Sequence, residues 1–155
     1  MHEFDLRPPS DAQRQALIQD LSAEERRVLL HQGTEPPFCG VFLDNRLDGV
    51  YVCRLCGLPL FRSAAKFDSG TGWPSFVQPC AERHVQLRVD DSHGMVRTEV
   101  VCGRCHSHMG HVFPDGPPPT GERYCLNSVA LAFVERGEAW PDPLRRGAAE
   151  AGTAD

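Results

Sequence analysis

The sequence predicts one mainly β domain, preceded by short helices and held together at one end by a zinc ion. Three observations predict this fold: β-branched segments separated by Gly and Pro after residue 49, two helix-capping motifs before it, and two Cys-x-x-Cys pairs. The 155 residues, 41% hydrophobic and 24% charged, suffice for a core without disulfides. We therefore expect a single globular domain.

Charge and hydropathy exclude two classes of partner. The chain has 16 Lys+Arg against 21 Asp+Glu, a formal charge of −5, and no basic tract, which argues against nucleic acid. Its longest apolar run, Val129–Val134, has six residues, whereas a membrane helix needs about 20. The N-terminus lacks the basic start and the apolar stretch of a secretory signal. We therefore expect a cytoplasmic protein.

Residues 1–33 are predicted to form an N-terminal helical segment. Ser10 and Ser22 are each followed three residues later by Gln or Glu, the spacing at which both side chains satisfy unpaired backbone N–H groups at a helix start. Two short helices follow, and Gly33 is expected to end the second in a left-handed conformation. A Pro-Pro pair then enforces a non-helical connector.

Residues 34–136 are predicted to form a zinc-containing, β-rich domain. Four β-branched segments are predicted as strands: Val50 to Arg54, Val85 to Val89, Met95 to Cys102 and Tyr124 to Val134. The loops at Asp68–Pro74 and Phe113–Gly121 are rich in Gly and Pro, and such loops often carry function. Residues 137–155 are polar and Pro-rich, which predicts a flexible tail.

Four of the seven cysteines predict a structural metal site. Two intervening residues let both sulfurs of a pair face one ion, and four thiolates suit tetrahedral zinc. The ligands are Cys53, Cys56, Cys102 and Cys105. The 45 residues between the pairs exceed the usual ribbon spacing of about 15–20, so we expect two hairpins clamped by one ion. A redox dithiol is disfavoured, because no βαβ pattern surrounds either pair.

The remaining cysteines are Cys39, Cys80 and Cys125. A reducing compartment and the odd number of cysteines argue against a disulfide framework. Arg123 lies two residues before Cys125, and a neighbouring cation can lower the pKa of a thiol, whose thiolate form is the nucleophile. Cys125 is therefore a candidate nucleophile.

A histidine cluster lies upstream of that cysteine. His106, His108 and His111 fall within six residues. Asp115 follows four residues after His111, and its carboxylate could orient one imidazole. On a strand, His111 would face differently from the other two unless the chain turns at Gly110. Acid–base work beside a thiol is the favoured interpretation, with a second metal site and ordinary surface polarity as alternatives.

Trp73 occupies a loop flanked by glycines, Gly70-Thr71-Gly72-Trp73-Pro74. A tryptophan in such a place can be a core anchor. It can equally form the wall of an apolar pocket wide enough for a methyl group. Composition and spacing leave these two roles open.

Four ordered motifs, together with both cysteine pairs, resemble the methionine sulfoxide reductase B family over about residues 22–135. The motifs are His31–Phe38, Gly72–Phe76, Ser107–Pro117 and Arg123–Ser128. The resemblance implies two antiparallel sheets, a zinc ion at the end far from the active site, and a catalytic domain over 34–136. It also implies reduction of methionine (R)-sulfoxide in proteins.

The resemblance further implies the roles of individual residues. Cys125 matches the nucleophile of the family, and Trp73 and Phe113 match the walls that receive the methyl group of the substrate. The matching polar groups of the active site are His108, His111, Asp115, Arg123 and Asn127. Either histidine could supply the proton that activates the sulfoxide oxygen.

One departure from the family concerns recycling of the enzyme. Many members carry a second, resolving cysteine before Trp73, where this chain has Thr71. A sulfenic acid on Cys125 must therefore be resolved by Cys39, which we favour, by Cys80, or by no internal thiol. A disulfide formed with Cys39 would then be reduced by thioredoxin, the reductant that the resemblance implies.

Two rival functions remain at this point. A zinc-clamped β domain could serve recognition alone, although a binding module does not need Cys125 with its histidine cluster. An enzyme acting on free methionine sulfoxide is the second rival, because only the resemblance favours the protein-bound form. We expect a monomer that acts on oxidised proteins, without nucleic acid or membrane as a partner.

Overall fold

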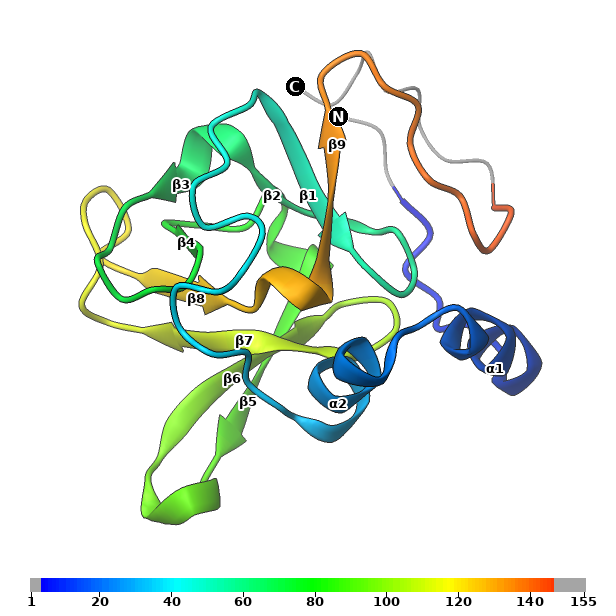
Figure 1. The fold of residues 1–155 in the computed structure, drawn as a ribbon, viewed down its shortest axis with the longest axis horizontal. Helices are drawn as coiled ribbons and strands as arrows, with labels where there is room; N and C mark the ends of the chain where they lie inside the picture. Colours follow the sequence, from blue (N-terminus) through cyan, green and yellow to red (C-terminus); the bar gives the residue numbers. More distant parts are fainter. Residues whose placement is uncertain (1–3, 147–155) are drawn as a thin grey trace.

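The computed structural model describes residues 4–146 and confirms a mainly β fold with two antiparallel sheets and two short helices (Figure 1). The three-stranded sheet has the order β2-β1-β9, with β1 Gly49–Cys53, β2 Pro59–Arg62 and β9 Leu131–Glu135. The six-stranded sheet has the order β3-β4-β8-β7-β6-β5, with β3 Lys66–Phe67, β4 Ser75–Phe76, β5 Val85–Asp90, β6 Arg97–Cys102, β7 His108–Phe113 and β8 Arg123–Leu126. The β5–β6 hairpin extends away from the rest of the molecule (Figure 1).

Both predicted helices are present, α1 at Asp11–Gln19 and α2 at Ala23–His31, each with the expected capping box. The predicted end of α2 was wrong by one residue, because Gln32, and not Gly33, adopts the left-handed conformation, with φ 54°. Gly33 is instead required because its backbone lies close to Arg27. A Cβ at this position would lie 2.7 Å from the Arg27 side chain.

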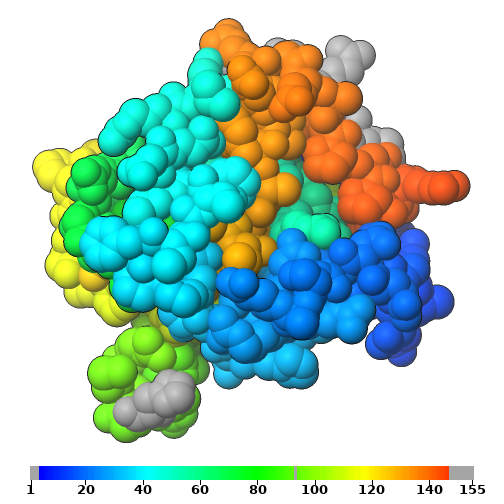
Figure 2. Space-filling view, in the orientation of Figure 1, coloured from blue at the N-terminus to red at the C-terminus, as the bar shows by residue number. Residues whose placement is uncertain are grey.

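The helical segment packs on the body of the protein through α2. Val28 and Leu29 of α2 are buried, and the helix contacts β7 and the 3₁₀ helix Ser128–Ala130. Helix α1 buries no side chain, although the Arg14 guanidinium donates to the carbonyl oxygen of Cys105 at 2.9 Å. The space-filling view shows the helices (blue) and the segment after them (cyan) next to each other on one face of the molecule (Figure 2).

The single strand predicted over 124–134 was wrong, because the chain changes sheets within it. Strand β8 lies in the six-stranded sheet and β9 in the three-stranded sheet, with the 3₁₀ helix at 128–130 between them. Asn127 forms the corner, where its backbone N–H and its side-chain amide both donate to the Met109 carbonyl oxygen. The predicted strands at 50–54, 85–89 and 95–102 correspond to β1, β5 and β6.

The core lies between the two sheets and is rich in aromatic rings. Phe76 of β4 stacks on Phe61 of β2 at 4.7 Å between centroids and meets Tyr51 of β1 edge-on at 5.1 Å. Tyr124 of β8 lies 5.6 Å from Phe61. Each fully buried side chain of this size stabilises the fold by about 1.5–3 kcal/mol, so these contacts fix one sheet against the other.

The described part of the tail predicted over 137–155 ends at residue 146, and the rest lies outside the described residues. Trp140 meets Phe4 edge-on at 6.1 Å, and Leu144 is buried. The Arg146 guanidinium donates to the carbonyl oxygens of Arg7 and Pro8. Trp140 and Arg146 therefore connect this part of the tail to the N-terminal segment. Over residues 4–146, no helix is long and apolar enough to span a membrane.

Candidate active site and metal centre

Strand register brings the candidate nucleophile and one histidine to the same face of the six-stranded sheet. Cys125 of β8 lies opposite Ser75 of β4 and opposite His111 of β7. In an antiparallel sheet, directly opposed residues project to the same side. Two positions along, Arg123 and Phe113 form the next opposed pair on this face, and the Arg123 guanidinium lies 4.4 Å above the Phe113 ring.

This row of side chains lines a pocket of about 250 Å³. The pocket residues are Thr34, Thr71, Trp73, Arg97, Gly110, His111, Phe113, Arg123, Cys125, Leu126 and Asn127. Six residues that the sequence singled out therefore meet in one cavity. Trp73 is fixed as a wall of this cavity, because its indole N–H donates to the Glu35 carbonyl oxygen at 2.9 Å.

Three other predicted residues do not line the pocket. Asp115 lies at its edge and holds Arg123 through two hydrogen bonds of 3.0 and 3.2 Å. His108 is buried next to His111, with 5.4 Å between the ring centroids. Cys39 is exposed, in the segment that follows Glu35.

A β-bulge explains how His108 and His111 come together. Val100 of β6 pairs with Gly110 and Val101 with His108, which leaves Met109 as an extra residue. The extra residue reverses the alternation of side chains, so two histidines three positions apart share a face. Gly110 has a different role from the turn that the sequence suggested. A Cβ there would lie 2.0 Å from the Cys125 carbonyl oxygen, so only glycine allows β7 and β8 to pair this closely.

Each histidine is held by a carboxylate that the sequence did not single out. His108 Nδ1 lies 2.7 Å from a Glu99 oxygen, and His111 Nε2 lies 2.8 Å from an Asp90 oxygen. Burial lowers the pKa of His108, against the opposing effect of Glu99. The Ser92 hydroxyl and His111 both hydrogen bond to Asp90 and lower the pKa of its carboxyl. No local sequence pattern predicts that Glu99 and Asp90 contact these histidines, because only the pairing of β5, β6 and β7 brings the carboxylates and the imidazoles together.

The groups around Cys125 shift the pKa of its thiol in opposite directions. Burial raises the pKa of the thiol above its ordinary value, and the charge of Glu35 adds to this effect. The Arg123 cation and a hydrogen bond from Thr71 lower the pKa of the same thiol. Thr71 was noted in the sequence only for the cysteine that many family members carry at this place, yet it lines the same pocket as the thiol. Burial outweighs the two stabilising groups in this structure.

We therefore expect the alkylation rate of Cys125 by iodoacetamide to rise with pH. Below the pKa of a thiol, the reactive thiolate fraction grows about tenfold per pH unit, and a raised pKa extends this rise through pH 7 to 9. Mass spectrometry of the Cys125 peptide measures the rate. Arg123→Ala is expected to slow the reaction at each pH, whereas Arg88→Ala, at an exposed arginine of β5, leaves it unchanged. A rate that levels off below pH 8 would contradict this expectation.

The predicted metal ligands form a buried cluster at the junction of the sheets. Cys53 ends β1 and Cys102 ends β6, and their partners Cys56 and Cys105 follow in the β1–β2 and β6–β7 turns. All four sulfurs lie within 4.8 Å of one another, with 3.6 Å from Cys53 to Cys105 and 3.5 Å from Cys56 to Cys102. The cluster could hold one metal ion and joins two hairpins, as the spacing predicted.

The donor set fits zinc. A tetrahedral ion with Zn–S bonds of about 2.3 Å separates its sulfurs by an amount close to the observed distances. The two turns also share one backbone geometry, because the fourth residue after the first cysteine has a positive φ in each, 80° at Gly57 and 63° at His106. Among the described residues, the histidine cluster does not form a comparable group of close ligand atoms.

Comparison with known proteins identifies the family of this chain. A family profile described as the SelR domain matches residues 21–135. A protein of Xylella fastidiosa (strain M23) named peptide methionine sulfoxide reductase MsrB is 64% identical over 144 residues, which cover 93% of this chain and 93% of the relative. Relatives with the same name are 62% identical in Caulobacter vibrioides (strain NA1000 / CB15N), over 93% of this chain and 91% of the relative, and 54% identical in Escherichia coli O139:H28, over 79% and 90%.

The fold and the two cysteine sites define a class of small β oxidoreductase that keeps its metal-binding thiols apart from a pocket thiol. None of the four cluster cysteines lines the pocket of Cys125. Within that class, the chain belongs to the SelR-domain family, the methionine sulfoxide reductase B proteins that its motifs resemble.

Proposed function

We propose that this protein reduces methionine (R)-sulfoxide in oxidised proteins to methionine, with Cys125 as the nucleophile. One observation carries the proposal: in a chain of this family, Cys125 and His111 are opposed on neighbouring strands inside a pocket walled by Trp73 and Phe113. The aromatic walls suit the methyl group of the substrate, and the polar side suits the sulfoxide oxygen. This separation of apolar and polar contacts supports recognition of one epimer.

In the first step, the Cys125 thiolate attacks, and the sulfoxide oxygen passes to the cysteine sulfur. His111 donates the proton that the oxygen needs, since it lines the pocket while His108 does not. Methionine leaves, and Cys125 becomes a sulfenic acid. The thiol has lost two electrons, and the substrate sulfur has gained them.

The other polar residues support this step from around the pocket. Arg123, clamped by Asp115, stabilises the thiolate. Asn127 accepts from the Glu35 backbone N–H and donates to the Met109 carbonyl oxygen, so it fixes the pocket floor. His108 positions His111 from behind through the ring contact. The proposed role of His108 is therefore orientation, and the proposed acid is His111.

In the second step, the Cys39 thiol condenses with the sulfenic acid, which releases water and leaves a Cys39–Cys125 disulfide. Cys39 lies four residues after Glu35, whose backbone contacts both Trp73 and Asn127 of the pocket. Cys39 does not line the Cys125 pocket, and a disulfide requires Cα atoms within about 7 Å, so we propose that the segment after Glu35 moves toward Cys125. Thioredoxin, an external dithiol, then reduces the disulfide.

A single-turnover experiment tests both steps. Excess enzyme without reductant is mixed with a peptide that carries either the R or the S sulfoxide, and methionine and free thiols are quantified. We expect reduction of the R epimer alone, with two thiols lost per methionine formed. Cys39→Ser is expected to form the same methionine with one thiol lost, and to lose thioredoxin-supported cycling.

Cys80→Ser is the matched control, because Cys80 is, besides Cys39, the cysteine that lies outside both the metal cluster and the Cys125 pocket. It is expected to behave as the wild type. If Cys80→Ser loses cycling and Cys39→Ser keeps it, Cys80 is the resolving residue. Reduction of neither epimer by metal-loaded protein would instead favour the binding-module function.

We also propose that the cluster holds one structural zinc ion. Its four cysteines would occupy every position of a tetrahedral ion, so the metal supplies a cross-link between the two hairpins. Burial raises the pKa of the Cys53 and Cys102 thiols, so their ionisation depends on the metal. We further propose that the protein acts as a monomer in the reducing cytoplasm, where such thiolates persist.

A further inference from the structure

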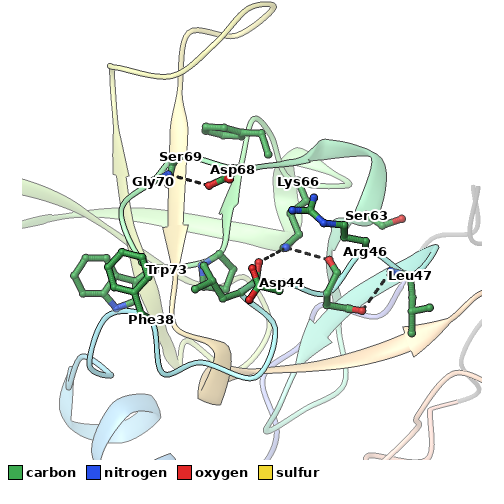
Figure 3. A pocket seen from close by; sticks show the side chains of 15 residues that line it. Phe38, Asp44, Arg46, Leu47, Ser63, Lys66, Asp68, Ser69, Gly70 and Trp73 are labelled. Atoms are coloured by element: carbon green, nitrogen blue, oxygen red, sulfur yellow. Dashed lines mark hydrogen bonds between the residues drawn. The ribbon is translucent and has the colours of Figure 1, made fainter.

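A second, larger cavity lies beside the Cys125 pocket. This groove has a volume of about 550 Å³ and runs between the segment 43–47 and the segment 66–74. Figure 3 shows Phe38 and Trp73 at one end and Arg46 and Leu47 at the other. The proposed chemistry at Cys125 makes no use of the groove. Its size falls in the range of about 300–1,000 Å³ that is typical of ligand sites.

Trp73 is the wall shared by the two cavities. The loop that carries it divides them, because Thr71 lines the Cys125 pocket whereas Gly70 and Gly72 line the groove. At Gly70, a Cβ would meet no atom within 4 Å, so the loop backbone there is open to an incoming chain. A molecule whose side chain enters the Cys125 pocket past Trp73 therefore has the groove next to it.

The lining of the groove suits a neutral polypeptide. Two cations, Arg46 and Lys66, are balanced by two carboxylates, Asp44 and Asp68. The Lys66 ammonium is already engaged, since it donates to the Leu43 and Asn45 carbonyl oxygens at 2.7 and 3.1 Å (Figure 3). The groove therefore offers no surplus charge for an ionic ligand.

Exposed apolar side chains stand at both ends of the groove. Phe38 is 69% exposed and Leu47 is 52% exposed. The Phe38 backbone N–H donates to the Gly72 carbonyl oxygen at 2.7 Å. Apolar contacts of this kind gain free energy when a partner covers them.

We propose that the groove binds the polypeptide segment on one side of the oxidised methionine, so that the substrate is recognised through its neighbours as well as through its sulfoxide. The proposal rests on the proposed function, because it assigns the Cys125 pocket to the sulfoxide side chain. The wall that the two cavities share at Trp73 is the observation that selects this occupant.

The test compares two substrates: N-acetyl-methionine (R)-sulfoxide methylamide, which has no neighbours, and a nine-residue uncharged peptide with the (R)-sulfoxide at its centre. Leu47→Glu is expected to raise KM for the peptide at least fivefold and to change KM for the blocked amino acid less than twofold. Leu87→Glu is the matched control, because Leu87 is 49% exposed on the β5–β6 hairpin. It is expected to leave both KM values unchanged.

The outcomes separate this proposal from the proposed function. If the wild type reduces both substrates and Leu47→Glu affects them equally, or affects neither, the groove does not bind the flanking chain. If Leu47→Glu raises only the KM for the thioredoxin reductant, the groove is a docking site for that protein, and the proposal is wrong. If the wild type reduces neither substrate, the proposed function itself fails.

Discussion

Cys125→Ser is expected to abolish methionine sulfoxide reduction while leaving the fold intact. The serine hydroxyl fits the same half-buried position between Ser75 and His111, but it is not ionised at neutral pH and does not accept the sulfoxide oxygen. Removal of a catalytic nucleophile typically lowers kcat by a factor on the order of 10⁴ or more. Methionine release from an (R)-sulfoxide peptide, followed by mass spectrometry, measures this loss.

Two control measurements distinguish loss of the nucleophile from loss of the fold. The thermal midpoint of Cys125→Ser should stay within a few degrees of the wild type, because serine is close to cysteine in size and Cys125 does not belong to the buried core clusters of the described residues. A second variant, Cys80→Ser, removes a thiol of similar burial and should retain full single-turnover activity. Methionine formation by Cys125→Ser at more than about one hundredth of the wild-type rate would show that another group is the nucleophile.

Loss of one cluster cysteine is expected to have the largest effect on stability. Structural zinc contributes about 10–16 kcal/mol to folding in zinc-finger peptides, which is comparable with the whole stability of a domain, about 5–15 kcal/mol. Cys53→Ser or Cys102→Ser should therefore yield insoluble protein, or metal-free protein whose Tm is lower by at least about 10 °C, equivalent to roughly 3 kcal/mol. Zinc analysis and thermal unfolding measure both quantities.

Chelation provides the complementary measurement. A strong chelator should lower the Tm of the wild type toward that of the variants, and added zinc should restore it. Cys80→Ser again serves as control, since the Cys80 thiol lies outside the metal cluster and hydrogen bonds to the Pro59 carbonyl oxygen and to His84. A Cys53→Ser protein that is metal-free, folded and as stable as the wild type would disprove the structural role of the ion.

Local signals in the sequence were sufficient for the metal cluster and for the helix starts. The Cys-x-x-Cys spacing determines a turn whose two sulfurs converge, and a capping box acts within four residues, so each half of the cluster and each helix start depends on local residues. The fold is needed only to bring the two cysteine pairs together. The predicted strand over 124–134 failed for the opposite reason. The residues from Tyr124 to Val134 have high β propensity throughout, and only tertiary contacts of Asn127 divide them between two sheets.

The arrangement of the candidate site was beyond sequence analysis for a related reason. The residue types near Cys125 could be named from motifs, but His108 and His111 share a face only because of the bulge at Met109. The carboxylates of Asp90 and Glu99 lie 21 and 9 residues from their histidines. No period of a single strand encodes such pairs, because β5, β6 and β7 must first align.

The corner at Asn127 also determines which parts of the protein unfold together. Leu131, six residues after Cys125, pairs directly with Cys53 of the metal cluster. The strand that carries Cys125 and the strand next to the metal cluster are thus parts of one short stretch of chain. No flexible linker separates them, so neither strand can unfold independently of the other. We expect hydrogen exchange of β8 and β9 to accelerate together when zinc is removed, so that the reaction site and the metal site form one cooperative unfolding unit.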